Sequence, residues 1–339
     1  MTYHLTDIRE IRALLEGAGF RFSKSLGQNF LCDAAVPPRI AEAAGLDGET
    51  GVLEIGPGVG CLTMELARRA RRVVSVELDE RLRPVLARTL ADCPNVELVF
   101  GDILRQDLPA LVQTHFSDCA RAVVCANLPY QITTPVLTAL VRCGCLEQLT
   151  VMIQREVARR ICAKENTADY GAFSVLMQWH CRTEALFDVP PHCFLPAPKV
   201  TSSVIRLTRR AIPPAETADE ARMFALVRAA FQQRRKTLCN AMMHGLGLSR
   251  DRAAAALREC GLPEQIRGEA LSLAQFAALS DALGAVSPCP RHFAAHDCPR
   301  PVRRGRFFFL AKTALPAGLH PSAQSDTMRI RRNRRRTRR

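Results

Sequence analysis

The sequence predicts an α/β fold with a mostly parallel sheet, followed by a small all-α domain and a basic tail. Between residues 51 and 154, short runs rich in β-branched residues alternate with stretches of helical periodicity. This alternation is typical of parallel strands joined by helices that cover both faces of a sheet. Further along the chain the patterns become purely helical. The expected domains are residues 1–209, 210–286 and 287–339.

Residues 1–50 form a segment in front of the sheet. Apolar residues at helical spacing predict a helix within 6–18, which ends at Gly17 and Gly19. A basic, glycine-containing loop follows (FRFSKSLGQNFL, 20–31), and helical spacing resumes over 36–44.

The sheet region contains five clear strand patterns and three helical ones. The strands are expected at 52–55, 73–77, 96–100, 122–126 and 149–154, and the helices at 61–70, 80–90 and 135–142. Two more β-rich runs, 173–179 and 200–207, predict further strands. The proline-rich stretch between them (VPPHCFLPAPK) indicates a rigid loop at the sheet edge.

A linker over 210–217 (RAIPPAET) separates the sheet from the all-α region. Four helices are expected there, at 220–232, 236–243, 250–260 and 273–283.

The net charge of +14 is concentrated in the tail, since residues 288–339 carry +12 of it. The rest of the chain is nearly neutral, so total charge is a weak indicator that the folded part binds RNA. The tail shows no sustained periodicity and is expected to lack stable structure. It is either an RNA-binding arm or a non-native extension.

Three features predict a cytoplasmic protein. No apolar run is long enough to span a bilayer, and the N-terminus lacks the pattern of a secretory signal. The 14 cysteines include no Cys-x-x-Cys pair and are irregularly spaced, which is typical of unpaired thiols in a reducing compartment.

The first candidate site is a glycine-rich turn after a strand, VLEIGPGVGCLT (52–63). Gly56 and Gly58 there allow a tight turn and a close approach of a ligand to the backbone. Glu77 ends the next strand, 21 residues after Gly56, where a carboxylate can bind both hydroxyls of a ribose. The pattern predicts a nucleotide-like cofactor, although it is not the G-x-G-x-x-G of nicotinamide enzymes.

Asp102 follows the third strand in FGDI. Its carboxylate can accept a hydrogen bond from the amine of a cofactor's adenine. An Asp at this place also favours a helix N-cap, and the two roles are compatible.

The most specific motif is Asn127-Leu128-Pro129-Tyr130, directly after the fourth strand. It resembles the motif of amino-methyltransferases that act on planar exocyclic amines. The Asn127 side-chain oxygen and the Leu128 carbonyl can each accept one amine hydrogen, which favours a pyramidal nitrogen with its lone pair directed at a methyl donor. Pro129 stiffens the turn and Tyr130 can stack on the base. This chemistry requires no metal ion, and we predict no metal ligand.

A target base has to leave its stack to reach such a pocket and would then meet a second aromatic ring. Phe194, in PHCFLPAPKV, is the candidate for that ring. The alternative is that Phe194 packs under the proline-rich loop.

Taken together, the motifs resemble those of the small-subunit (16S) ribosomal RNA adenine N6,N6-dimethyltransferase family. They run in family order from about residue 20 to 283. The segments that carry the resemblance include SLGQNFL (25–31), LEIGPGVGCLT (53–63), NLPYQITTPVL (127–137), YGAFSVLMQW (170–179), FDVPPHCFLPAPKVTSSVIRL (187–207) and FQQRRKTLCNAM (231–242). Gln131 departs from the family, which usually has Asn after the Tyr of the motif.

The resemblance implies a Rossmann-like class I methyltransferase domain that binds S-adenosylmethionine, with a small helical domain after it. It assigns cofactor contacts to Asn29 and Leu31, which close over the cofactor, and to Gly56, Glu77, Asp102 and Asn127. It also implies dimethylation of two adjacent adenines in the 3′-terminal hairpin of the RNA, on an assembling 30S subunit. Nothing in the sequence requires a dimer or a membrane.

Several basic residues are candidates for phosphate contacts, although a basic run is often only a solvated face. They are Lys24, Lys199, Arg234, Arg235 and Lys236. Three other functions stay open: a large-subunit RNA dimethyltransferase of the drug-resistance type, an assembly factor that acts mainly by binding, and a nicotinamide-dependent oxidoreductase.

Overall fold

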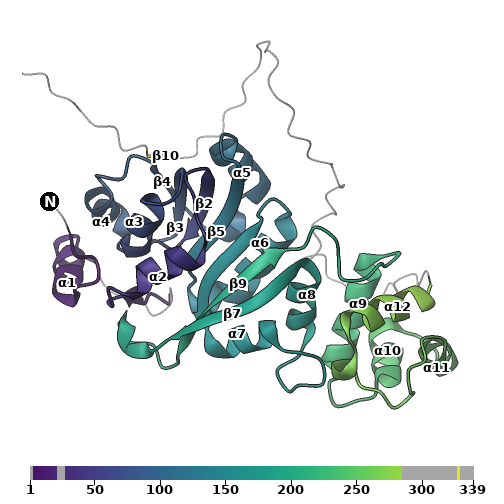
Figure 1. The fold of residues 1–339 in the computed structure, drawn as a ribbon. Coiled ribbons are helices and arrows are strands. Elements are labelled where there is room, and N and C mark those ends of the chain that lie inside the picture. The colour runs from purple at the N-terminus through teal and green to yellow at the C-terminus, as the bar shows by residue number, and fades with distance from the viewer. Residues whose placement is uncertain (1–2, 21–26, 285–326, 329–339) are drawn as a thin grey trace, which may run out of the picture.

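The computed structural model describes residues 3–20, 27–284 and 327–328. An α/β part built on one twisted sheet is followed by a cluster of helices at the other end of the molecule (Figure 1). Lys24 lies outside the described residues, as does the predicted tail except for residues 327–328.

The central sheet confirms the predicted α/β class. Its strand order is β10-β4-β3-β2-β5-β6-β9-β7, with parallel pairing from β4 to β6 and antiparallel pairing of β10, β9 and β7. The strands are β2 (Thr50–Ile55), β3 (Arg72–Glu77), β4 (Val96–Phe100), β5 (Arg121–Asn127), β6 (Gln148–Gln154), β7 (Cys181–Val189), β9 (Ser202–Arg209) and β10 (Thr327–Met328). The parallel strands are rich in Val and Ile because both of their faces are buried.

Helices cover the two faces of this sheet as two separate hydrophobic layers. One layer contains α1 (Ile8–Gly17), α2 (Val36–Ala43), α3 (Cys61–Ala67) and α4 (Arg83–Thr89). The other contains α5 (Leu108–Phe116), α6 (Thr133–Cys143) and α7 (Arg155–Cys162). A second, two-stranded sheet pairs β1 (Phe30–Leu31) with β8 (Phe194–Leu195). Short 3-10 turns connect these elements: η2 (Glu80–Leu82), η3 (Ile103–Arg105), η4 (Tyr130–Ile132) and η5 (Pro191–Cys193).

The predicted strand over 173–179 is wrong, because this segment is the helix α8 (Ala172–His180). A short continuous apolar run does not distinguish a buried strand from a buried helix. Here the Ser174 hydroxyl accepts a hydrogen bond from the Gly171 N–H and caps the first turn. The next segment, β7, was not predicted as a strand; among the described residues it pairs only with β9, and it shows no clear alternation of buried residues.

The helical part agrees with the predicted pattern. It contains α9 (Glu220–Gln232), α10 (Leu238–Leu246), α11 (Arg250–Glu259), the 3-10 turn η6 (Gly268–Ala270) and α12 (Leu273–Ala282). Helix α10 begins two residues later than predicted because Thr237 is its N-cap. Helix α8 also contributes to the core of the helical part. The ring of Trp179 on α8 meets the ring of Phe224 on α9 edge to face, with 6.3 Å between the ring centres. The division at residues 209 and 210 stays a prediction.

Two further expectations concern the whole chain. All 12 cysteines among the described residues are free thiols. None of the described helices is both long and apolar enough to cross a membrane. In the tail, Thr327–Met328 forms the short strand β10 beside β4, where the sequence predicts no stable structure.

Candidate active site

One pocket lies at the carboxyl ends of β2, β3, β4 and β5, the edge at which open α/β sheets bind ligands. It brings together nine of the ten residues predicted for catalysis and cofactor binding. These are Asn29, Leu31, Gly56, Gly58, Glu77, Asp102, Asn127, Leu128 and Tyr130.

The glycine-rich turn forms the floor of this pocket. The N–H of Gly56 donates to the carbonyl of Val76 on β3 at 2.9 Å, which holds the turn against the next strand. Gly56 and Gly58 have φ values of +70° and +61°, which other residues rarely adopt. A Cβ atom on Gly58 would also lie 2.9 Å from the ring of Phe30. The turn therefore has no side chains at the point where residues 27–31, here called the β1 segment, lie over it.

Glu77 ends β3 and is only 6% exposed. One of its carboxylate oxygens, Oε1, accepts a hydrogen bond from the N–H of Asp79 at 2.8 Å. Loss of water on burial raises the pKa of Glu77 to about 7. A buried carboxylate that lines a pocket in this way fits a diol such as the two hydroxyls of a ribose.

Glu54 also lines the pocket, although it was not among the residues predicted from the sequence. Its Oε2 accepts hydrogen bonds from the hydroxyls of Thr63, at 2.7 Å, and Ser75, at 2.6 Å. Burial raises the pKa of Glu54 to about 7. The signal in the sequence was an acidic residue inside an otherwise apolar strand, where an unsatisfied charge would be costly.

Asp102 performs the structural role that its residue type predicted. Its Oδ1 accepts from the N–H of Leu104 at 2.9 Å, which caps the 3-10 turn η3. The side chain also lines the pocket, so the predicted contact with an adenine amine is compatible with the cap.

The Asn-Leu-Pro-Tyr motif begins at the last residue of β5. The Asn127 side-chain nitrogen donates to the main-chain carbonyl of Asn29 at 3.3 Å. The N–H of Leu128 donates to the carbonyl of Met152 on β6 at 3.1 Å, so the turn is tied to the sheet. The Tyr130 hydroxyl lies 2.6 Å from that of Ser202, which fixes the ring at the pocket wall.

A contact that the sequence analysis did not identify holds the β1 segment over the pocket. Gln28 donates from Nε2 to Oδ2 of Asp79 at 2.8 Å. Asp79 is buried and is also paired with Arg81 at 2.6 Å. The residues are 51 positions apart, and no local pattern marks the pair.

The structure does not bring Phe194 to the pocket. Its ring is 3% exposed and lies in the hydrophobic layer under the proline-rich loop, and its backbone pairs with Leu31. The alternative stated from the sequence, packing under that loop, describes this residue. In this conformation the ring cannot stack on a base.

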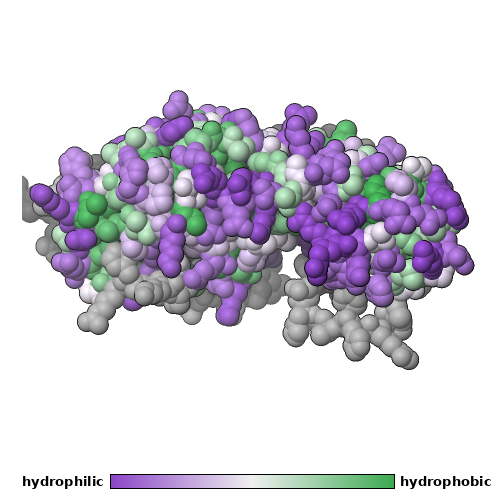
Figure 2. All heavy atoms as spheres, turned by 90° about the horizontal axis from the view of Figure 1, so that it is seen from below, coloured by the Kyte–Doolittle hydropathy of each residue, from purple (hydrophilic) through white to green (hydrophobic). Residues whose placement is uncertain are grey.

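The basic candidates differ in their surroundings. Lys199, Arg235 and Lys236 are exposed. Arg234 is exposed too, but its side chain donates to the Ala168 carbonyl at 2.6 Å and pairs with Glu269 at 3.0 Å, so it holds the helical part to the loop after α7. Figure 2 shows strongly hydrophilic side chains gathered at the junction of the two parts of the molecule.

The pocket as a whole fits the cofactor that the resemblance implies. Buried or half-buried carboxylates stand at the ends of β3 and β4, and a bare glycine turn lies between β2 and α3. This combination of hydroxyl and amine acceptors with a glycine turn that lets a ligand approach the backbone closely suits an adenosine carrying an amino acid group.

Comparison with known proteins gives a family and several relatives. The model of the family described as ribosomal RNA adenine dimethylase matches residues 19–283. A protein of Geobacillus thermodenitrificans named ribosomal RNA small subunit methyltransferase A is 44% identical over 276 residues, 80% of this chain and 94% of the relative. A Clostridium perfringens protein with the same name is 45% identical over 282 residues, covering 82% and 97%.

Solved structures agree with these relatives. The crystal structure of the 23S rRNA methyltransferase ErmE matches with a TM-score of 0.58 and 32% identity, over 76% of this chain and 100% of that one. A dimethyladenosine transferase from Plasmodium falciparum matches with a TM-score of 0.62 and 21% identity, over 74% and 95%. The second likeness concerns the fold alone.

Proposed function

Because the chain belongs to the ribosomal RNA adenine dimethylase family, we propose that it dimethylates the N6 amine of adenines in small-subunit (16S) ribosomal RNA with S-adenosylmethionine as methyl donor. The relatives named for the small subunit are 44–45% identical to it, whereas the 23S RNA enzyme ErmE is 32% identical. This difference favours the small subunit over the large one. The Asn-Leu-Pro-Tyr motif in the pocket argues against a nicotinamide-dependent oxidoreductase.

One observation carries the proposal. The Asn-Leu-Pro-Tyr motif and the Glu77 carboxylate line the same pocket. Asn127, the first residue of the motif, is hydrogen-bonded to Asn29 in the β1 segment. When bound, S-adenosylmethionine supplies an electrophilic methyl group on a sulfonium. The pocket therefore has to hold a nucleophilic amine and a cofactor, but needs no strong base.

The residues of the motif act on the amine. Asn127 Nδ2 is engaged with Asn29, so Oδ1 is the atom placed to accept an amine hydrogen. The Leu128 carbonyl accepts the second hydrogen, held by the bond from the Leu128 N–H to β6. The Tyr130 ring, fixed by Ser202, supplies a face for the base.

The cofactor would be held by the other pocket residues. Glu77 would bind the ribose hydroxyls and Asp102 the adenine amine, while Gly56 and Gly58 leave room for the amino acid part. Leu31 and Asn29 would cover it from β1. The Gln28–Asp79 contact supports this assignment because it fixes the β1 segment over the glycine turn.

In more detail, we propose that the substrate is two adjacent adenines in the 3′-terminal hairpin. They are methylated in the cytoplasm on an assembling 30S subunit, and the enzyme acts as a monomer. Two observations support an extended RNA contact. Arg235 and Lys236 are exposed in the turn between α9 and α10, and Lys199 is exposed in the loop before β9. Each can neutralise a phosphate, which would align the RNA before the base enters the pocket.

The proposal is tested by transfer of labelled methyl groups from S-adenosylmethionine to ribosomal particles. Immature small subunits, mature small subunits and large subunits serve as parallel substrates. We expect label in the RNA of immature small subunits only. Label confined to large subunits would instead indicate the resistance-type activity, and absence of label from every particle would contradict both.

A further inference from the structure

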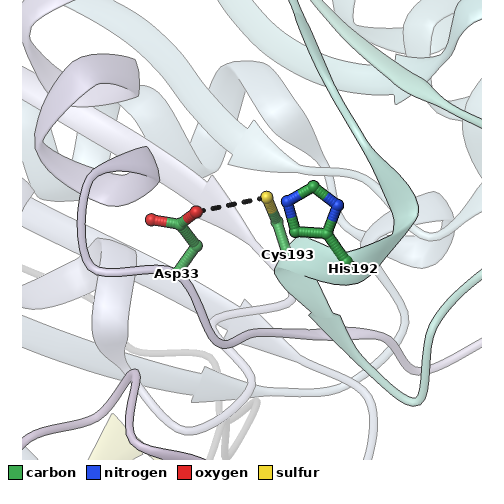
Figure 3. A group of neighbouring side chains, drawn as sticks. All are labelled: Asp33, His192 and Cys193. Carbon is green, nitrogen blue, oxygen red and sulfur yellow. Dashed lines mark hydrogen bonds between the residues drawn. The ribbon is translucent and has the colours of Figure 1, made fainter.

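Outside the active-site pocket, three side chains that can bind a metal meet where two distant segments of the chain come together. Figure 3 shows the sulfur of Cys193 between the carboxylate of Asp33 and the ring of His192. Their potential ligand atoms all lie within 4.8 Å of one another, and Cys193 Sγ is 3.3 Å from Asp33 Oδ2. We propose that Asp33, His192 and Cys193 form a binding site for Zn²⁺.

The backbone around these side chains is fixed by other contacts. The N–H of Cys32 donates to the carbonyl of Cys193 at 2.8 Å, which continues the β1–β8 pairing by one step. The N–H of Cys193 donates to the carbonyl of Pro190 at 3.1 Å. Asp33 Oδ1 accepts from the N–H of Ala35 at 2.9 Å, so Oδ2 is left facing the sulfur. The site is preorganised by its scaffold.

The donor set selects the metal. Thiolate, imidazole and carboxylate together are typical of zinc, whereas Ca²⁺ and Mg²⁺ take oxygen ligands. Zinc bonds of about 2.0–2.3 Å place ligand atoms roughly 3.3–3.8 Å apart in a tetrahedron. The observed spacing therefore needs only small rotations of side chains. With three protein ligands, water can occupy the fourth position on the exposed side of His192.

The position of the metal site links it to the β1 segment, which lies over the cofactor pocket. Asp33 lies two residues after Leu31, which lines the pocket, and Cys193 directly precedes β8, which pairs with β1. A metal bound here would fasten the β1 segment to the proline-rich loop at a second point. We expect loss of the metal to loosen this cover and to weaken the binding of S-adenosylmethionine several-fold.

Two competing chemistries have to be separated from this site. Cys32 lies opposite Cys193 across the two-stranded sheet, so a disulfide is another possible use of that sulfur. The sequence also carries Cys289, His292, His296 and Cys298 outside the described residues, and these side chains can bind zinc. The test protein is therefore the full chain with Cys289→Ser and Cys298→Ser.

The measurement is competitive titration of the reduced, metal-free protein with Zn²⁺ against a chromogenic chelator. Co²⁺ replaces Zn²⁺ in a second titration to report thiolate ligation by its charge-transfer absorption. We expect one metal per chain with a Kd on the order of 1 µM or below. His192→Ala and Asp33→Asn should each weaken binding at least about tenfold, the loss of roughly one ligand. Cys193 is buried, so the exposed His192 is the safer variant for folding.

Matched controls are His244→Ala, also an exposed histidine, and Cys260→Ser, a partly buried cysteine in the helical part. Both should bind metal as the test protein does. The proposal is overturned if no metal binds at about 100 µM, or if His192→Ala and Asp33→Asn bind as tightly as the controls. It is also overturned if mass spectrometry finds a Cys32–Cys193 disulfide in the purified protein and its reduction does not restore binding.

Discussion

The side-chain nitrogen of Asn127 donates a hydrogen bond to the main-chain carbonyl oxygen of Asn29, 3.3 Å away. This contact joins the end of β5 to a segment 98 residues earlier in the chain. It also orients the amide, since the nitrogen is engaged and the oxygen is left to accept a hydrogen from a substrate amine. The position of the cofactor cover and the orientation of the catalytic amide are therefore set by the same bond.

Gly58→Ala should weaken binding of S-adenosylmethionine and destabilise the protein. The added methyl group would lie 2.9 Å from the Phe30 ring, and the residue has a φ of +61°. Gly45→Ala is the matched control, because Gly45 has a φ of +60° but open space around it. Gly45→Ala should lose about 1 kcal/mol of stability in thermal unfolding, and Gly58→Ala should lose more because of the contact with Phe30. Only Gly58→Ala should also raise the Kd for the cofactor, by about tenfold or more, in calorimetry; equal Kd values would contradict the close approach.

Cofactor binding should depend on pH through Glu77. Burial raises the pKa of Glu77 to about 7, so much of this carboxyl group is protonated below neutral pH. If the ionised form binds the ribose hydroxyls, affinity for S-adenosylmethionine rises as the pH increases from about 6 to 8. Glu77→Gln should bind more weakly and lose this dependence. Glu54→Gln should keep this pH dependence. If Glu54→Gln abolished it, the titrating group would be Glu54 and not Glu77.

The same pKa shifts predict how stability depends on pH in the unliganded protein. The pKa values of Glu54 and Glu77, both about 7, exceed the ordinary value of a glutamate, so the folded state binds more protons than the unfolded state between about pH 4.5 and 7. The contribution of these two groups to the free energy of unfolding is therefore lost as the pH rises through this window. Urea unfolding of wild type and the Glu54→Gln, Glu77→Gln double variant at several pH values measures it. A difference between the two proteins that does not change from pH 5 to 8 would contradict the assignment.

Tyr130 should contribute through its ring more than through its hydroxyl. Tyr130→Phe removes the 2.6 Å contact with Ser202, which is worth about 1 kcal/mol, and should change kcat/KM only a few-fold. Tyr130→Ala also removes the stacking face, worth roughly 1–3 kcal/mol, and should lower kcat/KM by about ten- to hundred-fold. Steady-state methyl transfer to small subunits distinguishes them, and equal losses would argue that the hydroxyl is the functional group.

Arg234 and Arg235 are neighbours with different expected roles. Arg234→Ala removes the bonds to Ala168 and Glu269 and should lower the thermal unfolding temperature. Arg235→Ala should leave stability unchanged but weaken RNA binding and reduce the slope of log affinity against log salt by about one. Binding measured at several salt concentrations, beside thermal unfolding, separates the two effects. A stable Arg234→Ala protein with reduced RNA affinity would reverse the assignment.

The sequence predicted those parts of the site that depend on local geometry. A glycine turn between a strand and a helix places its neighbours at the carboxyl edge of a parallel sheet, and Glu77, Asp102 and Asn127 each end or follow a strand there. Their meeting in one pocket also requires the strand order β4-β3-β2-β5, which the sequence did not predict and the structure supplies.

Features that depend on distant packing were not predictable in this way. The segment 173–179 is mostly apolar, and its periodicity does not separate a buried strand from the helix α8, whose Val175 and Trp179 pack into the core of the helical part. Phe194 has an aromatic type that suits base stacking, but its burial depends on the pairing of β8 with β1. The Gln28–Asp79 and Asp33–Cys193 contacts join segments 51 and 160 residues apart, and no spacing in the sequence indicates them.

The most direct test of the central claim compares wild type with Asn127→Ala in labelled methyl transfer to immature small subunits, with the RNA digested to nucleosides. Wild type should yield N6,N6-dimethyladenosine. Asn127→Ala should yield at least about 100-fold less, because an acceptor for the amine in the transition state is lost. The Kd of Asn127→Ala for S-adenosylmethionine, measured by calorimetry, should change by less than about tenfold. The loss of activity would then lie in the methyl transfer and not in cofactor binding. Formation of dimethyladenosine by Asn127→Ala at the wild-type rate would contradict the role of Asn127. If the wild-type protein labelled any nucleoside other than a methylated adenosine, the proposed reaction would be wrong.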